Sequence, residues 1–137
     1  MTREDSAKIK PIDPLESASR TLDAEIAGLA KLKSNLSNDF VTSVEMLAGV
    51  NGRIIISGMG KSGHIGRKIA ATLASTGTPA QFVHPGEASH GDLGMITAQD
   101  IVIGLSWSGE TPELANLLAY VKRFKIPLIG ITSNADS

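Results

Sequence analysis

The stretch Ile54-Ile-Ile-Ser-Gly-Met-Gly-Lys-Ser-Gly-His-Ile-Gly66 decides the fold. Its three consecutive isoleucines form a short β-branched run, which is typical of a strand buried in a parallel sheet. Three glycines follow, and apolar residues then recur at helical spacing after Ser62, a residue type that favours a helix N-cap. The stretch therefore predicts a buried strand, a glycine turn and the start of a helix.

The turn between this strand and this helix is a candidate anion site. A helix start presents unpaired N–H groups and a partial positive charge, which favour an anion such as phosphate. Lys61 adds a full positive charge there, and Ser57 and Ser62 supply hydroxyl groups. We therefore predict a phosphate site at the end of this strand. The alternative is a plain tight turn, since glycine turns are common in α/β folds.

Two phosphate motifs overlap at this turn, and neither is complete. The segment 58–63 fits G-x-G-x-x-G, but a dinucleotide site also needs an acidic residue about 20 positions on. The second strand ends Phe82-Val-His-Pro85, with no carboxylate before Glu87. A P-loop needs glycine at position 55, where the chain has isoleucine. NAD and ATP are disfavoured, so we expect a small phosphorylated ligand and no cofactor.

Composition narrows the class of protein. The 137 residues suggest one domain, and 42% apolar residues suffice for a core. A net charge of −1 gives no electrostatic case for binding nucleic acid or an anionic membrane. The absence of cysteine excludes disulfides and thiolate chemistry. With no apolar run of membrane-spanning length and no signal-peptide pattern, we expect a cytoplasmic protein.

The N-terminal third is expected to be helical after a loose polar tail over residues 1–12. Asp13-Pro14-Leu15-Glu16 is a strong helix start, with an N-cap, a proline at the first helical position and an acidic third residue. An apolar stripe at spacings of three and four runs on to Leu36 and would either cover the sheet or pair with a partner chain. A second helix is predicted from Ser37 or Asn38 to about Ala48.

The remainder alternates strands and helices. Further strands are predicted at 80–83, 101–105 and 127–132, with helices at about 62–76 and from Pro112 onward. This order favours a parallel sheet in a three-layer αβα sandwich, in which ligands bind beyond the carboxyl ends of the strands. Because residues 133–136 resemble one more strand-to-helix turn, we expect the chain to be a fragment of a longer protein.

A second candidate phosphate loop follows the strand at 101–105. Ser106, Ser108 and Thr111 place three hydroxyls in a short turn directly before Pro112. Hydroxyl and N–H groups at a helix start are phosphate ligands. Thr111 is also expected to cap the following helix. A cap does not explain the two serines, so the phosphate interpretation is favoured.

These motifs together resemble a sugar isomerase (SIS) domain, and more narrowly the arabinose-5-phosphate isomerase family. The resemblance runs from about Asp13 to the end of the chain. The segments that carry it are 58–68, 75–79, 83–88, 90–94 and 108–111. It implies a five-stranded parallel sheet flanked by helices, a partial SIS domain over residues 13–137, and a pair of CBS domains beyond it.

The resemblance also implies an activity. The family interconverts D-ribulose 5-phosphate and D-arabinose 5-phosphate through an enediol, supplying the Kdo of lipopolysaccharide or capsule. Its members form homo-oligomers whose active sites are shared between subunits. By resemblance, Lys61 and Glu113 match catalytically relevant positions, and His90 matches a catalytic or substrate-binding histidine. A pentose phosphate is thus the expected ligand.

Other positions are implied less directly. Gly77 and Thr78 match substrate contacts, and His84 matches a position that touches substrate and binds zinc adventitiously, so no metal is expected to be required. Trp107 stands where the family often has Asn. The family's further catalytic Glu and His lie downstream of Ser137. Two rival functions stay open: a non-catalytic sugar-phosphate regulator and part of a dinucleotide-dependent dehydrogenase.

Overall fold

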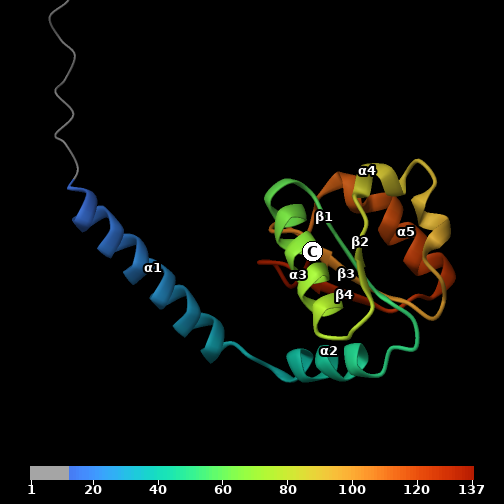
Figure 1. The fold of residues 1–137 in the computed structure, drawn as a ribbon, viewed down its shortest axis with the longest axis horizontal. Helices are drawn as coiled ribbons and strands as arrows, with labels where there is room; N and C mark the ends of the chain where they lie inside the picture. Colours follow the sequence, from blue (N-terminus) through green and yellow to red (C-terminus); the bar gives the residue numbers. More distant parts are fainter. Residues whose placement is uncertain (1–12) are drawn as a thin grey trace, which may run out of the picture. The chain divides into compact units, whose positions relative to one another are not determined.

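The isoleucine run forms the most deeply buried part of a computed structural model that describes residues 13–137. The predicted tail at 1–12 lies outside these residues. The elements in chain order are α1 (Pro14–Ser34), α2 (Asn38–Ala48), β1 (Ile54–Gly58), α3 (Gly60–Ser75), β2 (Ala80–Phe82), α4 (Pro85–Ala88), η1 (Asp92–Met95), β3 (Ile101–Leu105), η2 (Pro112–Leu114), α5 (Ala115–Phe124) and β4 (Leu128–Ile131). This order confirms the predicted alternation (Figure 1).

The four strands form one parallel sheet in the order β2-β1-β3-β4. Ile54 aligns with Ala80 on one side and with Ile101 on the other, so the strands begin at a common amino end. All five residues of β1 are buried, as expected for a strand covered on both faces. Within the described residues β4 pairs only with β3, and Leu128 and Ile131 on it are 40% and 51% exposed.

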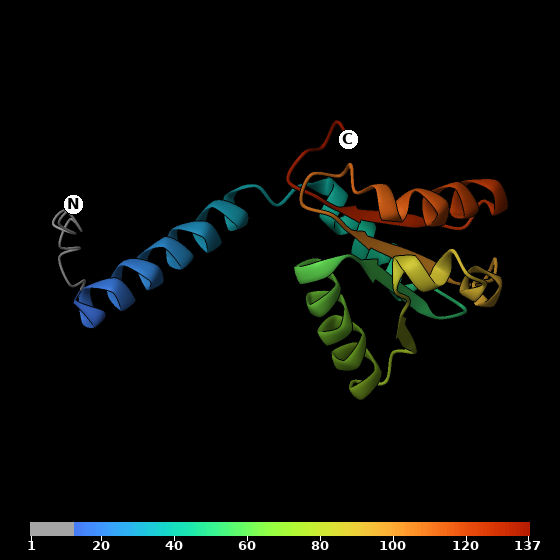
Figure 2. The same cartoon turned by 90° about the horizontal axis from the view of Figure 1, so that it is seen from above.

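Helices cover both faces of the sheet, which confirms the α/β fold. On one face Ile54 and Ile56 pack with Ala70 of α3 and with Leu47 at the end of α2. On the other face Ile55 and Val102 belong to a cluster with Leu117 and Val121 of α5. Figure 2 shows α3 and α5 on opposite sides of the strands. The sheet has four strands, whereas the resemblance implied five.

The connections leave the two central strands in opposite directions. The chain passes from β1 through α3 to β2, and from β3 through α5 to β4 on the other side of the sheet. The point between β1 and β3 is therefore a topological switch point, where open α/β sheets form a crevice at the carboxyl ends of the strands. The turn after β1 and the loop after β3 flank this crevice.

The chain divides into two compact units at Phe40 and Val41. In the first, Asp13 caps α1 by accepting a hydrogen bond from the Leu15 amide at 3.0 Å, as predicted. The helix ends at Ser34, and none of its residues is buried. Leu22 of the apolar stripe is 58% exposed. No helix among residues 13–137 is both long enough and apolar enough to span a membrane.

Candidate functional site

The start of α3 differs in detail from the prediction. The helix begins at Gly60 and Met59 occupies the N-cap position without a side-chain hydrogen bond, so Ser62 is not the cap. The reason is Gly60, whose φ of +56° turns the chain into the helix immediately after β1. Lys61 and Ser62 therefore lie in the first turn, beside the amides that a helix start leaves unpaired.

The glycine pattern also has a packing role. A Cβ on Gly63 would lie 2.7 Å from the carbonyl oxygen of Gly58, a contact that real Cβ atoms do not make. Glycine at this position lets α3 approach the end of β1 closely. The alternative of a tight strand-to-helix turn is thus correct for part of the motif. It is compatible with an anion site, because the helix start stays at the carboxyl end of the sheet.

The loop after β3 holds its hydroxyls differently from the prediction. The hydroxyls of Ser106 and Thr111 bond each other at 2.6 Å, and Ser106 Oγ accepts a bond from the Gly109 amide at 3.0 Å. Thr111 makes no side-chain cap, since the next turn is the 3-10 segment η2. Ser108 is exposed and accepts a bond from the Glu110 amide at 3.2 Å. The loop is therefore stabilised from within.

A cavity of about 280 Å³ lies at the switch point. The residues lining it come from the first turns of α3, from the ends of β3 and β4 and from the segments that follow these two strands: Lys61, Ser62, Ile65, Leu105, Ser106, Trp107, Ile131, Thr132 and Ser133. The structure thus brings together Lys61, Ser62 and Ser106, as the carboxyl-end rule predicted. Sequence reasoning did not assign Ile65 or the segment 131–133 to the site. The segment 131–133 could have been found, because it lies at the carboxyl end of the predicted fourth strand.

Ser57 does not face this cavity. Its side chain is fully buried, and its hydroxyl donates to the carbonyl oxygen of Val83 at 2.8 Å. The bond ties the end of β1 to the chain just after β2. The structure therefore does not bring the Ser57 hydroxyl, predicted as a phosphate ligand, to the cavity, because this hydroxyl bonds within the sheet.

The two loop histidines and Glu113 lie around the same end of the sheet without joining the cavity lining. His84 is the N-cap of α4, and its Nδ1 accepts a bond from the Gly86 amide at 3.2 Å. His90 and Glu113 are exposed, and neither lines the cavity at the switch point. Across residues 13–137 no group of three or more His, Cys, Asp or Glu side chains is placed to hold a metal ion, so His84 belongs to no such group there.

Gly77 and Thr78 lie at the opposite end of the sheet. They follow the last residue of the 16-residue α3 and precede β2, whereas Lys61 is at the start of that helix. An α-helix rises about 1.5 Å per residue, which separates Lys61 from Gly77 by roughly 24 Å. One chain therefore does not bring these residues to the cavity.

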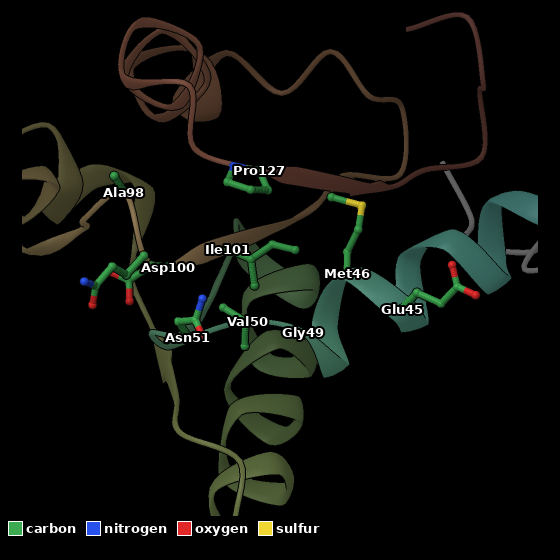
Figure 3. Close-up of a pocket in the computed structure, with 10 residues that line it drawn as sticks. Glu45, Met46, Gly49, Val50, Asn51, Ala98, Asp100, Ile101 and Pro127 are labelled. Atoms are coloured by element: carbon green, nitrogen blue, oxygen red, sulfur yellow. The ribbon is translucent and has the colours of Figure 1, made fainter.

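A larger cavity, of about 380 Å³, lies at the amino end of the sheet (Figure 3). Met46 of α2 and Ile101 of β3 face it, with Val50 and Pro127 nearby. Two acidic residues line it: Asp100, which is 3% exposed and hydrogen-bonded through both carboxylate oxygens, and Glu45, which is exposed on α2. Within the described part of the chain no basic side chain lines this cavity, whereas Lys61 lines the smaller one at the switch point, so the smaller cavity is the better candidate for an anion.

Asp100 anchors a polar network that sequence reasoning missed. It accepts bonds from the Arg53 amide at 2.7 Å and the Thr97 amide at 2.8 Å, and pairs with the Arg53 guanidinium at 3.2 Å. Burial raises the pKa of this carboxyl, but the Arg53 side chain and the two amides lower it more, so the pKa lies below its ordinary value. The signal was positional, because Arg53 and Asp100 directly precede two adjacent strands in register.

Fold and cavity together define a doubly wound α/β domain with a crevice at its switch point. A family model described as SIS domain matches residues 46–137, and the chain belongs to this family. The chain is 52% identical over 126 residues to an arabinose 5-phosphate isomerase KdsD of Pseudomonas aeruginosa. That match covers 92% of this chain but only 39% of the relative. The chain thus spans well under half the length of this curated relative.

Solved structures show the same fold. A protein of Escherichia coli CFT073, solved in complex with arabinose 5-phosphate, superimposes with a TM-score of 0.83 at 36% identity, covering 92% of this chain and 69% of that one. A protein of Listeria monocytogenes, described as a sugar-phosphate isomerase, gives a TM-score of 0.87 at 34% identity, over 93% of this chain and 69% of that one.

Proposed function

We propose that this chain is the sugar-phosphate-binding part of an aldose–ketose isomerase that interconverts D-ribulose 5-phosphate and D-arabinose 5-phosphate. The observation that carries the proposal is the 52% identity to an arabinose 5-phosphate isomerase over 92% of the chain. The cavity supports it independently. Lys61 and the start of α3 favour an anion there, and Ser62 and Ser106 add polar groups to the lining.

The chemistry suits such a site. A base removes the proton on C2 of the open-chain aldose, beside the C1 carbonyl, and the electron pair moves to the oxygen. The resulting enediolate takes up a proton on its C1 oxygen and becomes the enediol. The enediol then accepts a proton at C1 and loses one from its C2 hydroxyl, which gives the ketose. A positioned base contributes roughly 10²–10⁴-fold, and a donor at the developing oxyanion acts on the same transition state. Electrons stay within the substrate, so no redox cofactor takes part.

Lys61 is the proposed donor to the enediolate oxygen or to the phosphate. Among residues 13–137 the salt bridge that forms joins Arg53 and Asp100, so Lys61 is in no ion pair there. Lys61 is exposed and lines the cavity, which leaves its ammonium group free to contact a ligand. Glu113 is the proposed proton-transfer group and His90 a substrate contact, both by resemblance. Both are exposed and outside the cavity lining, so the proposal assigns them to the part of the sugar that extends beyond the cavity.

The position of Gly77 and Thr78 favours a homo-oligomer. If these residues contact substrate, as the resemblance implies, they must serve the site of another copy, because about 24 Å of helix separates them from Lys61. The biosynthesis of Kdo for lipopolysaccharide in the cytoplasm is the proposed setting.

A thermal-shift comparison tests the binding part of the proposal. The chain is melted alone, with arabinose 5-phosphate, with NAD and with inorganic phosphate. Ligand at about 100 times its dissociation constant stabilises by roughly 2.7 kcal/mol, which raises the melting temperature by several degrees. We expect this shift with the sugar phosphate and none with NAD. A shift with NAD alone would contradict the proposal and favour a dehydrogenase.

A turnover assay tests the catalytic part. Ribulose 5-phosphate is incubated with the chain and with the protein that contains it, and arabinose 5-phosphate is measured. Binding together with turnover supports the isomerase. Binding without turnover in the longer protein would instead favour the alternative, a regulatory domain that senses a sugar phosphate.

A further inference from the structure

Trp107 is the least buried of the large apolar side chains that line the switch-point cavity. Its indole is 82% exposed, compared with 55% for Ile65 and 51% for Ile131 in the same lining. An aromatic ring of this size usually contributes most when it is buried against a partner. Nothing in the packing of the sheet requires tryptophan at this position, because the side chain adds little to the core.

The backbone of Trp107 is firmly held although its ring is exposed. Its carbonyl oxygen accepts bonds from the Ser133 hydroxyl at 2.6 Å, the Ser133 amide at 3.0 Å and the Thr132 hydroxyl at 3.3 Å. These bonds join the loop after β3 to the chain after β4. The indole therefore stands on an anchored backbone at the wall of the cavity.

The cavity has two chemically different parts. The start of α3 contributes the cation of Lys61 and the hydroxyl of Ser62, whereas Ile65, Ile131 and Trp107 contribute apolar surface. A bare phosphate ion would use only the first part. A sugar phosphate has an anionic end together with carbon-bound hydrogens, which pack favourably on an aromatic face, so it would use both.

We propose that Trp107 stacks on the carbon chain of the bound sugar phosphate and sets the preference of the site for a sugar phosphate over inorganic phosphate. This inference rests on the proposed function, because the occupant is the same sugar phosphate. Phosphate binds at the helix start whether or not the indole is present. Trp107 acts on the remainder of the ligand and is thus a specificity-determining residue.

The test uses the fact that Trp107 is the only tryptophan of the chain, so its emission reports on this position alone. The wild-type chain is titrated with arabinose 5-phosphate and with inorganic phosphate, and dissociation constants are measured by calorimetry in parallel. We expect the sugar phosphate to shift the emission to shorter wavelength, because stacking removes the indole from water. Inorganic phosphate should bind without this shift.

Two variants complete the test. Trp107→Ala should weaken arabinose 5-phosphate about fivefold to tenfold and leave inorganic phosphate within about twofold, while Trp107→Phe, which keeps a ring, should lose less than about threefold. Equal weakening of both ligands, an unchanged affinity for the sugar phosphate, or a changed oligomeric state by sedimentation would each overturn the inference. If the wild type binds the sugar phosphate with calorimetric heat but Trp107→Ala binds it equally well, the proposed function stands and the inference fails. If the wild type does not bind the sugar phosphate, both fail.

Discussion

At the amino end of the sheet Arg53 and Asp100 form a salt bridge, whereas at the carboxyl end Lys61 is exposed beside a cavity. Both ends carry charged residues directly beside buried strands. At the amino end both carboxylate oxygens of Asp100 accept hydrogen bonds, which makes the group structural. At the carboxyl end we propose that the exposed charge of Lys61 contacts a ligand. Pairing thus distinguishes the structural charge of Asp100 from the exposed charge of Lys61, and the cavity beside Lys61 distinguishes it from other exposed lysines such as Lys68.

Asp100→Ala tests whether the charge at the amino end stabilises the fold. The substitution removes a buried carboxylate and leaves the part-buried Arg53 and Thr97 amides and the Arg53 guanidinium without their acceptor, so we expect a loss of about 3 kcal/mol in the free energy of unfolding. Urea unfolding measures it. Asp23→Ala is the control, because Asp23 is exposed on α1 and should change stability by less than about 0.5 kcal/mol. A loss below about 1 kcal/mol at Asp100 would show that the network is not structural.

The second prediction concerns the close approach of α3 to β1. Gly63→Ala places a Cβ within 2.7 Å of a backbone oxygen that has no freedom to rotate away. We expect a loss of about 2 kcal/mol and weaker sugar-phosphate binding, because the start of α3 must shift. Gly28→Ala is the matched control. No atom lies within 4 Å of its added Cβ in the interior of α1, so it should be neutral or stabilising. Equal effects at the two glycines would contradict the packing role of Gly63.

Lys61→Ala should lower turnover and leave stability nearly unchanged, whereas Asp100→Ala should lower stability. We expect turnover of the protein that contains this chain to fall at least tenfold, which corresponds to about 1.4 kcal/mol, with stability changed by less than about 0.5 kcal/mol. Lys68→Ala is the control, since Lys68 is exposed on the same helix but outside the cavity lining. Unchanged turnover would remove Lys61 from the mechanism.

The last prediction concerns the pH dependence of the stability that Asp100 contributes at the amino end, and its effect is the least of the four. The folded-state pKa of Asp100 is lowered, so its contribution to stability is present above its unfolded pKa of about 4 and is lost as pH falls through the folded value. The stability difference between wild type and Asp100→Asn should therefore shrink between about pH 5 and pH 2. Urea midpoints measured across this range test it. A difference that grows on acidification would have the wrong sign.

The strands were predictable because their signal is local. β1 and β3 are short apolar runs buried on both faces, and both begin at the predicted residue. The end of α3 near Gly77 was likewise marked by residue type. The hydroxyl contacts were not predictable, because they depend on tertiary partners. Ser57 donates across the sheet to Val83, and Thr111 bonds Ser106 instead of capping a helix.

Contacts between side chains on different strands also could not be predicted from the sequence, because they depend on the order of the strands in the sheet. Arg53 and Asp100 are 47 positions apart and become neighbours because β1 and β3 lie side by side. Ile131 and Trp107 share a cavity for the same reason, as β3 pairs with β4. The sequence predicted a parallel sheet but did not rank its strands, so these pairs had to come from the structure.

The outermost strand β4 has a practical consequence for anyone who purifies this chain. Its outward-facing N–H and C=O groups lack a strand partner within the described residues, and Leu128 and Ile131 on it are exposed. An exposed edge strand of this kind can pair with a strand of another chain, which leads to concentration-dependent aggregation. A lysine in place of Ile131 would discourage this association, but at the expense of one wall of the cavity.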